Sequence, residues 1–316
     1  LFNKREDMIP SPPSKSYVEQ EDMLRTHLQG RISLELETYG LDVTLIRGSQ
    51  SNNNCGFHVC EFMRKVADST VSGNTQTLTS YSEEGNDDGH IREYVFSNMF
   101  AGRFLTSEEM KSELDSLQTS IQRKEIEKES SVTTYFQNKV NELKQLDKKT
   151  NREEANQLES DFLKVEGKIH SYLTTDKMAN DLIVERYVSM SNTFLSKNGI
   201  QNAFFYTPHY SNLFASKVDL LSSPLKDITD YQKTLKNIVK NKSITSHYIP
   251  INIPSSHWLL ACVHFEPDPS NFDKRKVNVR VYDSCVDEEN YNNKNSNLVI
   301  ILSQFIQTII RIKNQN

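Results

Sequence analysis

The sequence predicts an α+β fold, in which a small sheet is packed against helices. Three observations carry this prediction. Near the N-terminus, apolar residues at helical spacing are followed by an alternating, β-branched stretch over residues 41–46. Near the C-terminus, three segments have the composition of strands, at residues 248–254, 255–265 and 277–283. They are followed by the most apolar run of the chain, residues 298–310, which indicates a buried helix.

Composition excludes several classes of function. The 316 residues are 36% hydrophobic and 25% charged with a net charge of −5, which gives no electrostatic case for nucleic-acid binding. The apolar run at 298–310 is interrupted by polar residues and is too short for a membrane span, and no signal peptide is visible. Four cysteines without a pairing framework or a CxxC motif indicate a reducing compartment, cytoplasmic or nuclear, and no structural metal.

The first hundred residues predict a compact unit behind a flexible tail at residues 1–16, where three prolines fall. Residues 17–39 predict an amphipathic helix that Gly40 ends. Strand 41–46 then leads into a polar loop and a helix that begins at Cys55. A mobile surface loop is predicted from Ser69 to His90, and a further helix from Ile91 to Phe104.

Residues 105–171 predict a helical hairpin arm. Thr106 and Glu109 form a capping box, and the apolar residues that follow step by four and three, as a coiled-coil seam requires. Breaks are predicted near residues 129–133 and 148–152. The arm is either a solvated spacer between two halves of a domain or a surface that docks a partner or substrate.

Residues 172–316 predict a second compact region. Asn180 and Asp181 give a helix a polar start, residues 204–207 predict a short buried segment, and residues 230–240 predict another helix. The three predicted strands follow, the last two joined by a long acidic hairpin loop at residues 266–276.

Cys55 is the candidate nucleophile. The positive end of a helix and its unpaired amides favour a thiolate over a thiol. Gly56 permits close approach of another part of the chain, and Gln50 is placed to donate to an oxyanion. The alternative is that Cys55 is only a small buried hydrophobic residue. Cys55, His58 and Cys60 lie close in sequence, but this spacing does not favour a metal site.

Two residues near the C-terminus complete a candidate triad. His257 starts an apolar strand, and Asp283 ends the next one. Because the ends of antiparallel strands meet, we expect Asp283 to lie across from His257. The carboxylate would then hold the imidazole in one tautomer, and the imidazole would deprotonate Cys55. Taken singly, a strand histidine is also a common structural residue and a terminal aspartate a common turn residue.

Together these residues resemble the motifs of the cysteine proteases that process SUMO, ubiquitin and related modifiers, with their adenoviral and bacterial-effector relatives. The resemblance lies in Gln50 ahead of Cys55-Gly56-Phe-His-Val-Cys60, in Pro254-Ser-Ser-His257-Trp258, in Val281-Tyr-Asp283-Ser284 and in Asn180-Asp181. It implies a papain-like or adenain-like fold, a Cys55, His257 and Asp283 triad, and no cofactor. Gln50 is the implied oxyanion donor, with a neighbouring Asn of the same loop as the alternative.

The order of the motifs differs from that of the family, in which the segments with Gln and Cys come last. Joining the end of this chain to its beginning restores the family order, so the resemblance implies a circular permutation. Residues 17–104 would be the Cys-bearing half of the protease domain and residues 172–316 the His/Asp-bearing half. The arm at 105–171 would be inserted between the family's natural ends. Such a rearrangement costs little, because termini lie at the surface and often close together.

The resemblance implies an isopeptidase that cleaves after the C-terminal Gly-Gly of ubiquitin or a ubiquitin-like modifier such as SUMO. Its substrate-binding residues would be Trp258, Gly56, Met178 and Asp181, with Met178 standing where the family usually has a second Trp. The compartment would be the cytoplasm or nucleus, or those of a host cell if the chain is a bacterial effector. Two alternatives stay open, an acetyltransferase on the same scaffold and an inactive module that binds a modifier.

Overall fold

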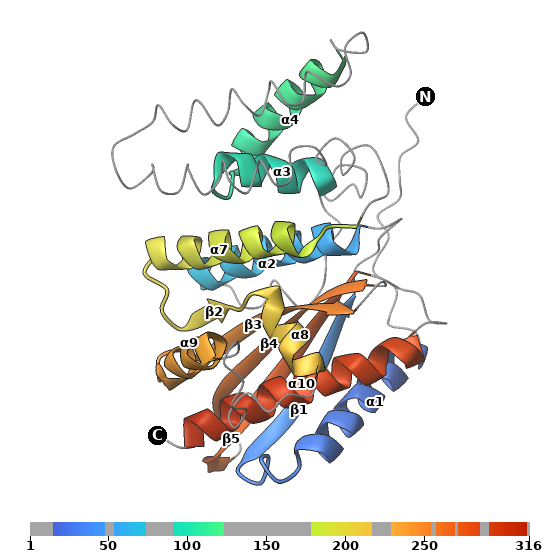
Figure 1. The fold of residues 1–316 in the computed structure, drawn as a ribbon, viewed down its shortest axis with the longest axis vertical. Coiled ribbons are helices and arrows are strands. Elements are labelled where there is room, and N and C mark those ends of the chain that lie inside the picture. Colours follow the sequence, from blue (N-terminus) through green and yellow to red (C-terminus); the bar gives the residue numbers. More distant parts are fainter. Residues whose placement is uncertain are drawn as a thin grey trace.

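The computed structural model describes residues 15–47, 54–73, 91–122, 178–216, 229–253, 257–268, 271–284 and 291–314. They form a five-stranded mixed sheet with helices packed against it, which confirms the predicted α+β class (Figure 1). The strand order is β1-β5-β4-β3-β2, with β1 parallel to β5, β2 parallel to β3, and β3, β4 and β5 antiparallel. The strands are β1 (Tyr39–Arg47), β2 (Ala203–Phe205), β3 (Ser246–Ile253), β4 (His257–Asp268) and β5 (Asn271–Asp283).

One face of the sheet carries the larger core. Alternate residues of β4, namely Leu259, Ala261 and Val263, join a cluster with side chains of four helices, as period-2 alternation requires. Those helices are α1 (Lys15–Ile32), α8 (Pro208–Ala215), α9 (Thr229–Lys240) and α10 (Tyr291–Asn314). The apolar run at 298–310 lies within α10 and contributes to this core, so the predicted buried helix is confirmed.

The opposite face of the sheet packs against the helix that carries Cys55. Trp258 and Leu260 of β4 belong to a second cluster, together with α2 (Cys55–Ser72) and α7 (Asp181–Lys197). Next to α2 lies α3 (Ile91–Ala101), and α4 (Ser107–Gln122) packs against α3. The second cluster therefore fixes the position of the Cys55 helix relative to β4.

The first and last helices lie side by side (Figure 1). The side-chain amide of Gln307 in α10 donates to the carbonyl of Arg31 in α1 at 2.7 Å. Arg311 of α10 also donates from Nε to Glu35, just beyond α1, at 3.0 Å. Segments from the two ends of the sequence thus share one side of the fold.

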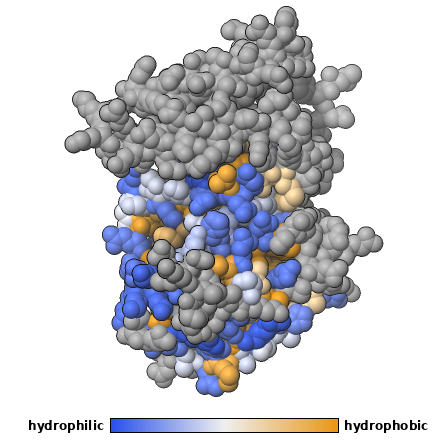
Figure 2. Space-filling model, in the orientation of Figure 1, coloured by the Kyte–Doolittle hydropathy of each residue, from blue (hydrophilic) through white to orange (hydrophobic). Residues whose placement is uncertain are grey.

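Hydrophilic side chains cover much of the described surface on the face shown in Figure 2, and apolar ones form small areas between them. Among the described residues, the exposed large hydrophobic side chains are Val18, Leu34 and Leu182. None of the helices in the described ranges combines the length and apolar character that crossing a bilayer requires.

The predicted helix at 17–39 is wrong at its end. α1 stops at Ile32, and both Tyr39 and Gly40 belong to β1. Tyr39 pairs with Arg275 of β5 and its ring meets Phe265 edge-on at 6.1 Å, so tertiary pairing overrides the local signal. The tail predicted at 1–16 overlaps α1 by two residues, and residues 1–14 lie outside the described ranges.

The predicted hairpin loop at 266–276 is also wrong, because β4 and β5 extend almost to their turn. Glu266 pairs with Lys276, and the carboxylate of Glu266 accepts from Asn278 of β5. Cross-strand pairs of opposite charge stabilise a sheet although their composition resembles that of a loop. A register shift beside Pro267 accommodates the missing amide donor of this proline.

Local signals elsewhere had mixed outcomes. The capping box is confirmed, since Glu109 N donates to Thr106 Oγ1 and Thr106 N donates to Glu109 Oε2. The predicted loop at 69–90 is wrong for its first residues, because α2 continues to Ser72 and ends at Gly73, whose φ is 69°. Residues 74–90 and 123–177 lie outside the described ranges, and the second of these includes the rest of the predicted arm at 123–171.

Candidate active site

Cys55 is the first residue of α2, as predicted, and is 1% exposed. The helix begins there because Phe57, Val59, Met63 and Val66 fall at helical spacing and are buried in the second cluster. The Cys55 sulfur therefore lies at the positive end of a helix that cannot move without opening this core.

His257 and Asp283 meet at the same end of the sheet. His257 is the first residue of β4 and Asp283 the last of β5, and His257 Nε2 lies 2.6 Å from Asp283 Oδ1. The two side chains are buried. The register differs from expectation, because Asp283 pairs with Leu259 and not with His257. His257 lies two residues beyond that pair, so the carboxylate reaches it diagonally along one face of the sheet.

Cys55 reaches His257 around the end of the sheet. By alternation His257 shares a face with Leu259, whereas α2 packs against the opposite face through Trp258. The Cys55 side chain nevertheless lies close enough to His257 to be one of the two partners that raise the pKa of its imidazole. The contact is possible because each residue is the first of its element. Since Nε2 bonds to Asp283, Nδ1 is the ring nitrogen that remains for the sulfur.

The electrostatics of His257 are those of an imidazole between two acidic groups. Burial lowers the pKa of His257, but the hydrogen bonds to Asp283 and Cys55 and the charges of both partners outweigh it and raise this pKa to about 10. The imidazole therefore stays protonated through neutral pH. An imidazolium beside a cysteine at a helix start is the arrangement that activates a thiol as a nucleophile.

Gly56 and Trp258 form a close contact beneath the first turn of α2. A Cβ atom on Gly56 would lie 2.6 Å from Ala179 Cβ and 3.0 Å from Trp258 Cδ1, so close approach requires glycine, as predicted. Trp258 is 1% exposed and donates from Nε1 to the carbonyl of Ala179 at 3.1 Å. The indole thus connects the strand of His257, the helix of Cys55 and the segment that precedes α7.

The segment before α7 contains the other two predicted substrate-binding residues. Met178 is half-buried and packs against the second cluster. Asp181 accepts from Asn252 Nδ2 of β3 at 3.2 Å, and Asn180 caps α7 by accepting from Ile183 N at 3.1 Å. Gln50, the predicted oxyanion donor, lies outside the described ranges.

Sequence reasoning missed a buried pair beside Cys55. Arg92 of α3 donates from Nε to Asn54 Oδ1 at 2.7 Å, and the two residues are 7% and 5% exposed. The guanidinium carbon of Arg92 lies 4.8 Å from the centroid of the Phe57 ring. The one available signal was a cation at the second position of α3, which does not indicate its partner.

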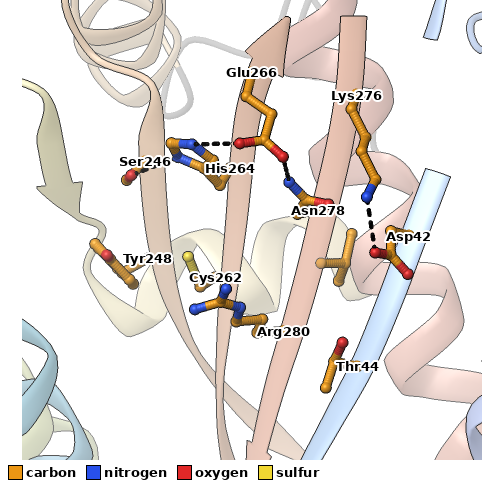
Figure 3. Close-up of a pocket in the computed structure, with 11 residues that line it drawn as sticks. Asp42, Thr44, Ser246, Tyr248, Cys262, His264, Glu266, Lys276, Asn278 and Arg280 are labelled. Atoms are coloured by element: carbon orange, nitrogen blue, oxygen red, sulfur yellow. Dashed lines mark hydrogen bonds and ion pairs between the residues drawn. The ribbon is translucent and has the colours of Figure 1, made fainter. Parts of the chain in front are cut away.

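A second cysteine and histidine lie near each other in a polar pocket of about 340 Å³ (Figure 3). Burial raises the pKa of Cys262 to about 12 and lowers that of His264, whose Nδ1 bonds to Ser246 Oγ at 2.8 Å. Burial also raises the pKa of Cys60. Cys60 and Cys262 therefore remain thiols at neutral pH. Cys55 differs from them because His257 lies beside it. No group of side chains in the described ranges has the composition of a metal site.

Comparisons of the chain with protein-family models, with curated proteins and with solved structures gave no match. The site is therefore interpreted from its own geometry.

Proposed function

We propose that this protein is a cysteine protease or isopeptidase that cleaves after the C-terminal Gly-Gly of ubiquitin or a ubiquitin-like modifier such as SUMO. The observation that carries the proposal is that Asp283 bonds to His257 at 2.6 Å and that Cys55 lies beside the same imidazole. The acid orients the base, and the base activates the nucleophile. This relation defines a catalytic triad on any fold. The resemblance of the surrounding motifs supplies the substrate class.

In the proposed mechanism, the Cys55 sulfur attacks the carbonyl carbon of the modifier's last glycine. A C–S bond forms, the C–N bond to the lysine amine breaks, and protonated His257 gives its proton to that amine. Water then attacks the thioester while His257 accepts the proton of water, and Cys55 is released. The backbone amide of Cys55, with Gln50 as second donor, would hold the oxyanion, each worth about 2.7–4 kcal/mol.

The fold in this proposal is a circularly permuted papain-like or adenain-like domain. The contacts between α1 and α10 support it, because they pack the first and last described helices together and so join the Cys-bearing and His/Asp-bearing segments. The pairing of β1 with β5 also supports it, since it attaches the Cys-bearing segment directly to the strand of Asp283. The helical arm would then bridge the family's natural ends.

In this proposal the Gly-Gly tail of the modifier lies beside the first turn of α2. Gly56 packs directly on Trp258 and Ala179, so no side chain separates this turn from the indole. An extended Gly-Gly segment has no side chains of its own and can approach such a surface closely. Trp258 and Met178 would form the walls, and Asp181 would fix the segment that carries Met178 through its bond to Asn252.

The test uses ubiquitin and SUMO that carry a C-terminal electrophile, with the adduct detected by intact mass. We expect wild-type protein to form an adduct with at least one modifier, and Cys55→Ala to form none. Cys60→Ala is the matched control, because Cys60 lies on the same helix and is also buried. Thermal unfolding of both variants should remain close to wild type. Loss of reaction in Cys60→Ala with retention in Cys55→Ala would overturn the assignment.

Two other outcomes would identify the alternatives. If Cys55 instead gains an acetyl group from acetyl-CoA and no modifier adduct forms, the chain is an acetyltransferase on this scaffold. If a folded protein binds a modifier but reacts with neither reagent, it is an inactive binding module. Either result excludes the protease.

A further inference from the structure

The polar pocket around Cys262 lies on the same face of the sheet as α2, but farther along β4. Trp258, Leu260 and Cys262 alternate along this strand and belong to the second cluster, so their side chains share that face. Strands β1, β3, β4 and β5 all contribute to the pocket (Figure 3). Cys262 follows the first residue of β4, His257, at about 17 Å along an extended strand. The pocket is therefore separate from the candidate active site.

Both carboxylates that line this pocket already have partners (Figure 3). Asp42 of β1 lies 3.0 Å from the ammonium group of Lys276 on β5. Glu266 of β4 accepts from Asn278 of β5 with one oxygen, and its other oxygen lies 3.7 Å from Nε2 of His264. Neither carboxylate is left to pair with the other cation of the pocket.

Arg280 of β5 is that other cation, and its side chain is half-buried. In the part of the chain that the structure describes, no carboxylate forms an ion pair with its guanidinium. Burial raises the pKa of Cys262 to about 12 and lowers the pKa of His264, and the charge of Arg280 lowers both. The positive charge of the guanidinium thus extends into the pocket, where no bonded acid offsets it.

We propose that this pocket binds a small molecule that carries a carboxylate or phosphate group, and that the anionic group pairs with Arg280. A guanidinium presents parallel N–H donors that match two oxygens of either group. Thr44 is exposed and lies directly opposite Arg280 in the register of β1 and β5, so its hydroxyl is a further donor at this end of the pocket. A volume of about 340 Å³ is within the range of small-molecule sites. The site goes beyond the proposed function and does not depend on it.

Phenyl phosphate and benzoate test the site, because they carry the two kinds of anionic group on the same ring. Benzyl alcohol is the neutral probe. The measured quantity is the unfolding temperature of the full chain as a function of probe concentration, at constant ionic strength. A ligand that binds only the folded state raises this temperature as its concentration increases. We expect such a rise with at least one of the two anions and none with benzyl alcohol, and the anion with the larger rise identifies the preferred group.

Arg280→Gln should weaken binding of the anion by about tenfold or more, because it removes the charge-assisted pair. Arg275→Gln is the matched control, since Arg275 lies on the same strand but is exposed and does not line the pocket. Thr44→Glu keeps the guanidinium but places a carboxylate opposite it, so this variant should also lose the response to the anions. Circular dichroism establishes that each variant is folded. The proposal is overturned if neither anion stabilises the wild type, or if folded Arg280→Gln and Thr44→Glu respond as the wild type does.

Discussion

Asp283 bonds to His257 across a diagonal of the sheet and not to a residue directly opposite. Asp283 pairs with Leu259, yet its Oδ1 lies 2.6 Å from Nε2 of His257, two residues beyond Leu259. His257 is the first residue of β4, and the register places it diagonally from Asp283. With Nε2 bonded to Asp283, Nδ1 is the ring nitrogen that remains for Cys55.

Replacing Asp283 should lower activity severely. Asp283→Ala removes the group that orients His257, and we expect the rate of modifier cleavage to fall by about 10²–10⁴-fold, as in other triads. Asp283→Asn keeps the size of the side chain but loses its charge, and activity should fall by a comparable factor. The control is Asp42→Asn, since Asp42 pairs with Lys276 and lies outside the triad. Cleavage by Asp283→Ala within twofold of wild type would contradict the role of this carboxylate.

Folding stability should decrease as pH rises above neutrality. His257 titrates near pH 10 in the folded protein but near 6.5 when unfolded, so between these values the folded state binds more protons. The stabilisation is complete below pH 6.5 and is lost as pH rises through about 10, at up to about 1.4 kcal/mol per pH unit.

Urea unfolding from pH 6 to pH 10 measures this slope. His257→Gln should flatten it, because glutamine does not titrate, and the difference between the two curves isolates His257 from other groups. A wild-type slope equal to that of His257→Gln would show that the histidine is not held protonated.

Gly56→Ala and Gly30→Ala should have opposite effects on stability. The added methyl of Gly56→Ala would overlap Ala179 and Trp258, and we expect a loss of about 1–3 kcal/mol as well as reduced cleavage. Gly30 lies within α1 and has no atom within 4 Å of an added Cβ, so alanine there should stabilise by about 0.5–1 kcal/mol. Denaturant unfolding of the two variants provides the comparison. Equal stability of both would contradict the close packing at Gly56.

Features that depend on neighbouring residues were predictable. Thr106 and Glu109 form the expected capping box, Asn180 caps α7, and α2 starts at Cys55, because each depends on a few consecutive residues. The extension of β4 and β5 through residues 266–276 was not predictable. There the charges are paired across strands, and only the register brings Glu266 to Lys276.

The contact between Arg92 and Asn54 at the candidate site was also not predictable. The residues near Arg92 in the sequence do not indicate Asn54 as its partner, because packing of α3 on α2 brings the two together. A short helix, α8, was also missed, since its start at Pro208 follows Thr207 without a side-chain cap.

By itself, the sequence determined which chemical groups stand at which ends of helices and strands: a thiol at the start of α2, an imidazole at the start of β4 and a carboxylate at the end of β5. Only the tertiary structure decided that these ends meet, that Asp283 bonds to Nε2 of His257, and that Arg92 bonds to Asn54 beside Cys55. The physical reason is the distance along the chain over which each kind of interaction acts. Propensity and capping act within a few residues along the chain, whereas proximity between distant segments follows from burying both faces of one sheet.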